Sequence, residues 1–399
     1  MIPREEYITK LEAFRNKQII KVVTGLRRSG KTTLMELYED KLRKDGVLEE
    51  QIIHINFEDV DYDYIETYKD LHSEVVKRLV PDRMNYIILD EVQRVEGFER
   101  AVDSLYLRKN CDLYITGSNS KLLSGDLATL LSGRYVEINV LPLSFKEFAA
   151  AKDANTPLDI LYQDYVDNGS FPFVAQLNDQ WAIKQYLEGI YDSVVLKDII
   201  SRRNSIDTSV LNRIIKFLFS NVGSECSANK IAGVLTAAGR KIAPQTVDQY
   251  LEAVVESFIF YKADRYDIRG KDLLKTNPKY YATDPGLRKV VIGSSSSDAG
   301  HILENVVYLE LLRRGCRVYV GKIGPAEVDF VAVSDEGEEY YQVAYTVKDA
   351  DGKTLERELR PLLSIRDHNP KHLLTMDYGA VVNHNGIRQT NVLDWLIRI

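Results

Sequence analysis

The sequence predicts a multidomain α/β protein whose first part is a parallel β-sheet covered by helices. With 399 residues, the chain is longer than one hydrophobic core usually serves. Its hydrophobic fraction of 45% supports packed cores. Short apolar runs alternate with helical patterns in the first part of the chain, which is typical of a sheet whose strands are connected by helices.

Composition and charge limit the class of protein further. A net charge of -7 opposes electrostatic attraction of the whole protein to nucleic acid. It does not exclude a local basic surface. Cys111, Cys226 and Cys316 are widely spaced, and no Cys/His cluster has metal-ligand spacing, so we expect reduced, structural thiols. The sequence shows no secretory signal and no long apolar run. We therefore expect a cytoplasmic protein with no membrane partner.

Five apolar runs in the first part of the chain predict the strands of the sheet. Helical patterns begin at Lys31 and cover Leu71–Val80. After Pro142 the strand signals stop, so we expect the first domain to cover residues 1–142. The predicted strands are Ile19–Thr24, Gln51–Asn56, Tyr86–Leu89, Leu113–Thr116 and Tyr135–Val140.

We expect further domains after this core. Residues 143–205 read as helices interrupted by a Gly-Ser-Phe-Pro turn. Residues 206–292 give three helical patterns, a β-prone run at Phe258–Lys262 and a turn, an order typical of a winged helix-turn-helix. The small, polar stretch Gly293–Gly300 is the best linker candidate. Residues 298–399 predict a small α/β domain.

The segment Gly25–Thr32 fits the pattern G-x-x-x-x-G-K-[ST] and lies between an apolar strand and an amphipathic helix. In such a phosphate-binding loop, glycines let backbone N–H groups turn toward phosphates, and the helix N-terminus adds positive charge. Lys31 is expected to contact the β- and γ-phosphates of ATP, and Thr32 to place its hydroxyl on Mg²⁺. The residues expected to surround the nucleotide are Gly25, Arg28, Ser29, Gly30, Lys31, Thr32 and Thr33.

Another apolar strand ends in two carboxylates, Asp90 and Glu91. Its distance along the chain suits a position beside the first strand, with the carboxylates near the phosphate-binding loop. Asp90 is then expected to hold Mg²⁺, partly through water, and Glu91 to orient or deprotonate the attacking water. A strand whose acidic end merely meets solvent is the alternative. Together with the loop, the carboxylates predict a Mg²⁺-dependent ATPase.

The loop, the Leu-Asp-Glu strand end and a strand that ends at Tyr114–Asn119 together resemble the AAA+ ATPases. In that family a polar residue at this strand tip senses the γ-phosphate, and both Ser118 and Asn119 match the position. Arg134 resembles the arginine that many such ATPases use to stabilise transferring charge, although a surface arginine at the start of a strand is nearly as good an explanation. Action of Arg134 between subunits would imply a ring or dimer. Action within one chain would need only a monomer.

A closer resemblance extends over almost the whole chain. Short motifs follow the order found in prokaryotic ATPases that carry a DUF4143-type C-terminal region. This resemblance implies a P-loop AAA+ parallel-sheet core, a helical lid, a winged helix and a C-terminal restriction-endonuclease-like α/β domain. The motifs are Gly25–Lys31, Leu141–Phe148, Gly169–Pro172, Lys197-Asp198, Lys279–Gly286, Leu303–Asn305, Glu327–Phe330 and Tyr341–Val343.

In PD-(D/E)xK nucleases, a helix glutamate, a strand aspartate and an acid-x-lysine pair gather around a divalent metal. Glu304 and Asp329 match the first two positions, but Gln342 replaces the acid and Ala344 replaces the lysine. An amide offers no charge to the metal, and nothing establishes Lys322 as a substitute for the lysine. We therefore expect a nuclease fold without efficient cutting. A buried polar network around Glu304 and Asp329 is the alternative.

The predicted recognition helix of the winged domain, Ala243–Phe258, bears Asp248, Glu252 and Glu256 and no Lys or Arg. DNA phosphates repel such acids. DNA contact by the wing and a protein-docking role therefore stay equally open. The basic residues near the predicted wing are Lys262, Arg265, Arg269, Lys271 and Lys275.

As a whole, the sequence predicts an ATP-binding, Mg²⁺-dependent ATPase that acts as a nucleotide-driven switch. ATP and ADP are the expected ligands, and a protein partner or a second copy of the chain stays open. Two other classes of function remain. One is an ATP-gated, metal-dependent nuclease, and the other is a nucleotide-gated DNA-binding or scaffold protein with little turnover.

Overall fold

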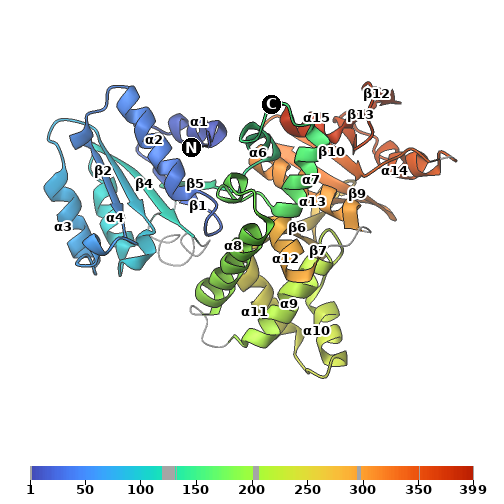
Figure 1. The fold of residues 1–399 in the computed structure, drawn as a ribbon, viewed down its shortest axis with the longest axis horizontal. Coiled ribbons are helices and arrows are strands. Elements are labelled where there is room, and N and C mark those ends of the chain that lie inside the picture. The colour runs from blue at the N-terminus through green and yellow to red at the C-terminus, as the bar shows by residue number, and fades with distance from the viewer. Residues whose placement is uncertain are drawn as a thin grey trace. The chain divides into compact units, whose positions relative to one another are not determined.

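The computed structural model describes residues 2–118, 131, 133–200, 206–293, 298–349 and 351–398. The chain divides into two compact units, which are Met1–Pro142 with Glu256–Phe258, and Leu143–Val255 with Ile259–Ile399. Figure 1 shows the helices and strands of both units. Among the described residues, we find no helix whose length and apolar character would let it cross a lipid bilayer.

The first unit contains a five-stranded parallel sheet with the order β2-β3-β4-β1-β5. All five predicted strands are present. One expectation is wrong, however, because β3 pairs with β2 and β4 and does not lie beside β1. The strand that carries the carboxylates is thus separated from the strand before the loop by β4. The strands are β1 (Ile20–Thr24), β2 (Ile52–Asn56), β3 (Asn85–Asp90), β4 (Cys111–Gly117) and β5 (Tyr135–Asn139).

Helices cover both faces of this sheet (Figure 1). They are α1 (Glu5–Ala13), α2 (Lys31–Lys44), α3 (Tyr68–Arg78) and α4 (Phe98–Tyr106), with short 3-10 helices η1 (Glu49–Gln51), η2 (Val60–Tyr62) and η3 (Val92–Arg94). Consecutive strand residues face opposite sides, so Val22 joins the core under α3 and α4, whereas Val23 joins the core under α1 and α2. Burial on both faces explains why the strands read as continuous apolar runs.

The second unit begins with a run of helices. They are α6 (Phe145–Ala150), α7 (Leu158–Asn168), the 3-10 helix η5 (Val174–Gln176), α8 (Gln180–Asp192), the π-helix η6 (Ser193–Ile200), α9 (Thr208–Ser220), α10 (Ala228–Ala237), α11 (Pro244–Glu256) and α12 (Pro285–Ile292). The three helical patterns of the predicted winged helix correspond to α9, α10 and α11.

Two of the motifs that carry the family resemblance meet within this unit. The backbone N–H and the hydroxyl of Ser170 both donate to Asp284 Oδ2, at 2.6 and 2.7 Å. Asp284 Oδ1 accepts the N–H of Leu287 and so caps the first turn of α12. A Cβ atom at Gly286 would lie 2.7 Å from the backbone of Gly169. These motifs therefore join the end of α7 to the start of α12, which is a structural role.

A mixed eight-stranded sheet with the order β12-β13-β11-β10-β9-β8-β6-β7 completes the second unit. Its elements are β6 (Phe260–Asp267), β7 (Asp272–Ala282), α13 (Ala299–Arg313), β8 (Arg317–Ile323), β9 (Ala326–Ser334), β10 (Gly337–Ala344), α14 (Lys353–Leu363), β11 (Lys371–Thr375), β12 (Val382–His384), β13 (Ile387–Asn391) and α15 (Val392–Ile397). The strands β6 and β7 form the expected hairpin, but β6 also pairs in parallel with β8. The hairpin is therefore part of the C-terminal sheet and not a free-standing wing.

Candidate nucleotide-binding site and C-terminal polar cluster

The loop between β1 and α2 has the backbone geometry that its glycines permit. Gly25 has φ +146°, and a Cβ atom there would lie 2.2 Å from the carbonyl oxygen of Val140. Gly30 precedes α2 in a left-handed conformation, with φ +98°. Neither position accepts a side chain without strain. The glycine spacing of the motif is thus required by the turn that leads from the strand into the helix.

Two polar side chains of the motif, Ser29 and Lys31, are buried. Lys31 Nζ donates to the carbonyl oxygens of Gly25 and Leu26, at 3.1 and 3.3 Å. The Oγ atom of Ser29 is buried and has no hydrogen-bond partner among the described residues. An unsatisfied buried donor is costly. A phosphate oxygen would satisfy it, so the loop fits the phosphates of a nucleotide.

Asp90, at the end of β3, is fixed by two hydroxyl groups. Thr32 Oγ1 donates to its Oδ2 at 2.6 Å, and Thr116 Oγ1 donates to its Oδ1. Asp90 is buried, with 1% of its surface exposed. A carboxylate and a threonine hydroxyl are hard oxygen ligands of the kind that Mg²⁺ prefers. The two residues expected to hold the metal are therefore in direct contact.

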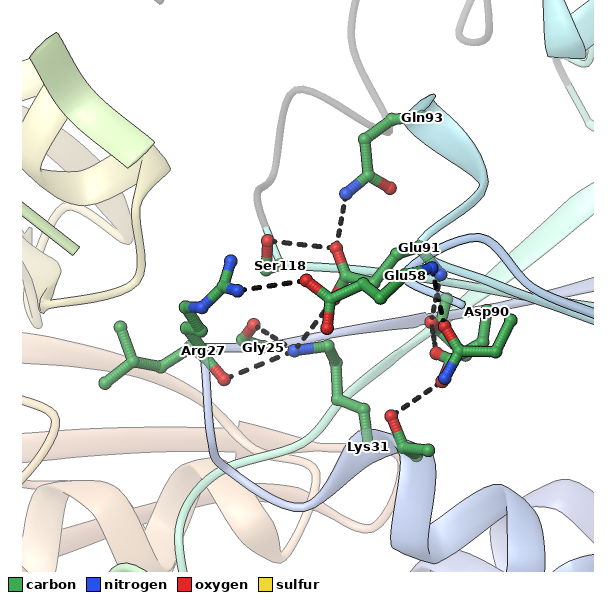
Figure 2. A network of polar contacts seen from close by, with 12 residues as sticks. Gly25, Arg27, Lys31, Glu58, Asp90, Glu91, Gln93 and Ser118 are labelled. Atoms are coloured by element: carbon green, nitrogen blue, oxygen red, sulfur yellow. Dashed lines mark hydrogen bonds and ion pairs between the residues drawn. The ribbon is translucent and has the colours of Figure 1, made fainter. Parts of the chain in front are cut away.

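Glu91 follows Asp90 in a left-handed backbone conformation, with φ +54° and ψ 42°. Its N–H donates to Thr116 Oγ1 at 3.0 Å. Its carboxylate accepts hydrogen bonds from Gln93 and Ser118, and its other oxygen lies 3.8 Å from Lys31 Nζ (Figure 2). The catalytic carboxylate expected from the sequence thus lies beside the loop lysine.

Two further ion pairs, which share the carboxylate of Glu58, lie at the edge of this site. Arg27 Nη2 donates to Glu58 Oε1 at 2.9 Å (Figure 2), and Arg94 Nη2 donates to the same oxygen at 3.0 Å. Sequence reasoning missed these residues, as it missed Thr116 and Gln93. The sequence contained a signal for Thr116, because it lies two residues before Ser118 and alternate residues of a strand share a face.

Two residues expected to surround the nucleotide are exposed, and one of the two candidates for the γ-phosphate sensor can be placed. Arg28 and Thr33 are exposed, and Arg28 has φ +67°. Asn119 lies outside the described residues. Sequence reasoning named Ser118 and Asn119 as alternatives for one role, and Ser118 is the one whose contact with the site can be described.

Arg134 lies at the opposite edge of the sheet. It directly precedes β5, whose first residue pairs with Ile20 at the start of β1, whereas the loop follows the end of β1. At about 3.3 Å per strand residue, the five residues of β1 separate the two ends by about 15 Å. The guanidinium pairs with Asp103 at 2.5 Å and lies over the ring of Tyr106. Arg134 therefore does not reach the loop of its own chain.

The residues of the second unit that the sequence compared with a nuclease site form a buried polar cluster that includes a lysine. Lys279 Nζ, from β7, lies 3.1 Å from Glu304 Oε1 and 2.8 Å from Glu327 Oε1. Tyr281 Oη donates to the same oxygen of Glu304 at 2.6 Å. Burial lowers the pKa of Lys279, but the charges of Glu304, Asp329 and Glu327 outweigh this effect and raise it. The lysine therefore carries a positive charge among these acids.

Asp329 and Gln342 adjoin the same cluster. Asp329 Oδ2 accepts the N–H of Val343 at 2.8 Å, and Gln342 Nε2 donates to Glu358 at 3.0 Å. Burial, and then the charge of Glu304, raise the pKa of Asp329 well above its usual range. Among the described residues, no group of three or more His, Cys, Asp or Glu side chains is arranged to hold a metal ion.

Two family models match parts of the chain. Residues 17–149 match the model described as an AAA domain, which spans the strands and loop of the candidate nucleotide site. Residues 160–298 match a model described as a domain of unknown function, DUF8612. In solved structures, the fold resembles the Walker-type ATPase PABY2304 of Pyrococcus abyssi, with a TM-score of 0.51 and 18% identity. That likeness covers 73% of this chain and 96% of the other.

Two relatives align with most of the chain. An uncharacterized protein of Haemophilus influenzae is 41% identical, and the alignment covers 100% of this chain and 99% of the relative. The uncharacterized protein MJ1544 of Methanocaldococcus jannaschii is 32% identical, over 86% of this chain and 79% of its own length. At this identity and coverage, the chain belongs to the same family as these two uncharacterized proteins, and its residues 17–149 match the AAA-domain model.

Proposed function

We propose that this protein is a Mg²⁺-dependent ATPase. The observation that carries the proposal is the hydrogen bond of 2.6 Å between Thr32 and Asp90, which joins the phosphate-binding loop to the carboxylate strand. The position of Lys31 beside Glu91 and the AAA-domain match support it. A strand whose acidic end merely met solvent would not bury Asp90 against two hydroxyl groups.

Each polar residue of the site has a separate role in this proposal. Lys31 binds the β- and γ-phosphates, and Thr32 and Asp90 hold Mg²⁺, which when bound neutralises charge on those phosphates. Glu91 orients the attacking water and accepts its proton. The water oxygen bonds to the γ-phosphorus as the bond to the bridging oxygen breaks, and ADP leaves. One proton of the water passes to Glu91, which then releases it to solvent, and the other stays on the phosphate that leaves.

Removal of the metal is expected to stop phosphate release. In the wild-type protein, release from ATP should fall to the uncatalysed level when EDTA exceeds Mg²⁺. The Thr32→Ala variant should need about tenfold more Mg²⁺ for half-maximal release, since one metal ligand is lost. Thr9→Ala, which removes an exposed helix hydroxyl from α1, is the control and should match the wild type. Equal release with and without EDTA would contradict the proposal.

We further propose that nucleotide binding acts as a switch on the segment where the chain leaves the first unit. Arg4 is buried and donates to the carbonyl oxygen of Ser29 in the loop, at 3.2 Å, and to that of Leu141, at 2.7 Å. Leu141 N–H in turn donates to Tyr7 Oη at 3.1 Å. One guanidinium therefore links the phosphate-binding loop to the last residues of the first unit. The predicted lid (143–205), winged helix (206–292) and C-terminal domain (298–399) follow.

This link predicts a change in protease sensitivity. Addition of ATP and Mg²⁺ should alter the rate of limited proteolysis beyond residue 142 in the wild type. Arg4→Met should bind ATP with similar affinity but lose this nucleotide effect, because the variant cannot bridge the two carbonyl oxygens. Calorimetry and a proteolysis time course measure the two properties. A nucleotide effect that persists unchanged in Arg4→Met would contradict the coupling.

For the C-terminal region we propose a nuclease-like domain that does not cut DNA. Lys279 and Tyr281 both occupy Oε1 of Glu304, so this oxygen is already bonded within the protein, and Gln342 supplies no charge. Lys279 is also the one feature that favours the alternative of an ATP-gated nuclease, since it supplies a lysine that the sequence motif lacks. Incubation of DNA with Mg²⁺ or Mn²⁺ separates the two. Cleavage that disappears in Asp329→Ala would support the nuclease.

DNA binding and self-association stay predictions. Arg265 is buried in ion pairs with Glu225, at 2.5 Å, and Glu327, at 3.0 Å, and Lys262 pairs with Asp264 at 2.7 Å. These pairs weaken the case for DNA contact by the hairpin. A salt series of duplex DNA binding tests it, because phosphate contacts give a steep dependence on salt. An effect of Arg134 on ATP turnover would require a second copy of the chain, which sedimentation with ATP would detect.

A further inference from the structure

Among the described residues, both side-chain hydrogen bonds to the Glu91 carboxylate are made to the same oxygen. Gln93 Nε2 donates to Oε2 at 2.5 Å, and Ser118 Oγ donates to the same oxygen at 3.2 Å. Figure 2 shows these two donors converging on one atom. Gln93 comes from η3, after β3, and Ser118 directly follows β4. Two donors from different segments restrict rotation of the carboxylate and give its other oxygen a fixed direction.

The other oxygen, Oε1, lies on the side of the phosphate-binding loop, in an ion pair with Lys31 Nζ at 3.8 Å. The backbone beneath it is also fixed. Glu91 has φ +54°, a conformation that residues other than glycine rarely adopt, and its N–H is bonded to Thr116. The strained backbone, the threonine and the two donors thus direct one oxygen of Glu91 toward the loop.

We propose that Gln93 is a positioning residue for ATP hydrolysis. With Ser118, it occupies Oε2 of Glu91 and so assigns the proton of the attacking water to Oε1. The inference rests on the proposed ATPase function. It also changes the role of Ser118, because a serine hydroxyl has one proton to donate. When Glu91 accepts that proton, Ser118 does not donate to the γ-phosphate. The sequence had left this sensing role open between Ser118 and Asn119.

The test replaces the amide of Gln93 with an apolar group of similar size. In Gln93→Leu, kcat for ATP should fall about tenfold, because the carboxylate loses one of its two donors, whereas KM should stay within about twofold. Ser118→Ala should show the same division between kcat and KM, and it serves as the second variant if Gln93→Leu does not fold. The control is Glu96→Gln, an exposed change on the same segment, which should match the wild type.

A double variant tests whether Gln93 acts through Glu91. Gln93→Leu should have no further effect on the residual rate of Glu91→Gln, since the group that it positions is already lost. A tenfold loss of rate that persists in the Glu91→Gln background would overturn the inference. A rise in kcat in Gln93→Leu alone would also overturn it, because the contact with Gln93 would then hold Glu91 away from its active position. If the wild type releases no phosphate from ATP, the ATPase proposal itself fails. If only Gln93→Leu behaves like wild type, only the positioning role fails.

Discussion

Glu91→Gln should lower the rate of ATP hydrolysis by about 10²- to 10⁴-fold while leaving ATP affinity nearly unchanged. This is the range that a general base contributes. The amide keeps the size of the side chain but does not accept the proton of the attacking water. Mg²⁺ is assigned to Thr32 and Asp90, and this substitution leaves both residues in place. The effect should therefore fall on turnover and not on binding.

Single-turnover phosphate release, with ATP limiting, measures this effect without a contribution from product release. Glu96→Gln makes the same chemical change at an exposed position nearby and should have the wild-type rate. Loss of ATP affinity in Glu91→Gln would instead indicate that Glu91 helps to hold the nucleotide. An unchanged rate would remove Glu91 from the chemistry.

The local features of the first unit could be predicted from the sequence because each depends on neighbouring residues. Strand β1, the loop and α2 are encoded by an apolar run, two glycines and a helical pattern, and all lie where the sequence indicates. The order of strands could not be predicted in this way. Whether β3 or β4 lies beside β1 depends on packing between distant segments, and apolar runs buried on both faces do not record their neighbours.

The missed site residues have a similar explanation. Thr116 contacts Asp90 because β4 lies between β3 and β1, so its role follows from the strand order that the sequence did not reveal. Gln93 lies in the 3-10 helix η3 and donates to Glu91, which precedes that helix in a left-handed backbone conformation. Motif patterns do not include such a contact.

The C-terminal cluster shows the same limit. The nuclease motif directs attention to the strand after Asp329, where the lysine is replaced by Ala344. The lysine of the cluster is instead Lys279, which lies on β7. It precedes Glu304 by 25 residues in the sequence. It enters the cluster because β6 and β7 are part of the C-terminal sheet. A boundary placed at the linker assigns Lys279 to another domain and thus conceals this contact.

Lys31→Ala should weaken ATP binding by about 100-fold or more. Its ammonium is buried at the mouth of the loop, on the carbonyl oxygens of Gly25 and Leu26. Loss of charged hydrogen bonds to phosphate costs about 3 kcal/mol, which corresponds to about 100-fold in affinity. The alanine is a good helix former at the start of α2, so the fold should be retained.

The central claim is that ATP and Mg²⁺ bind between β1 and α2. Isothermal titration calorimetry of the wild-type protein and Lys31→Ala with ATP and Mg²⁺ tests it most directly, with Glu91→Gln as a variant that should still bind. We predict saturable binding near one nucleotide per chain in the wild type and Glu91→Gln, and a loss of about 100-fold in affinity in Lys31→Ala. No binding in the wild type, or equal affinity in wild type and Lys31→Ala, would contradict it.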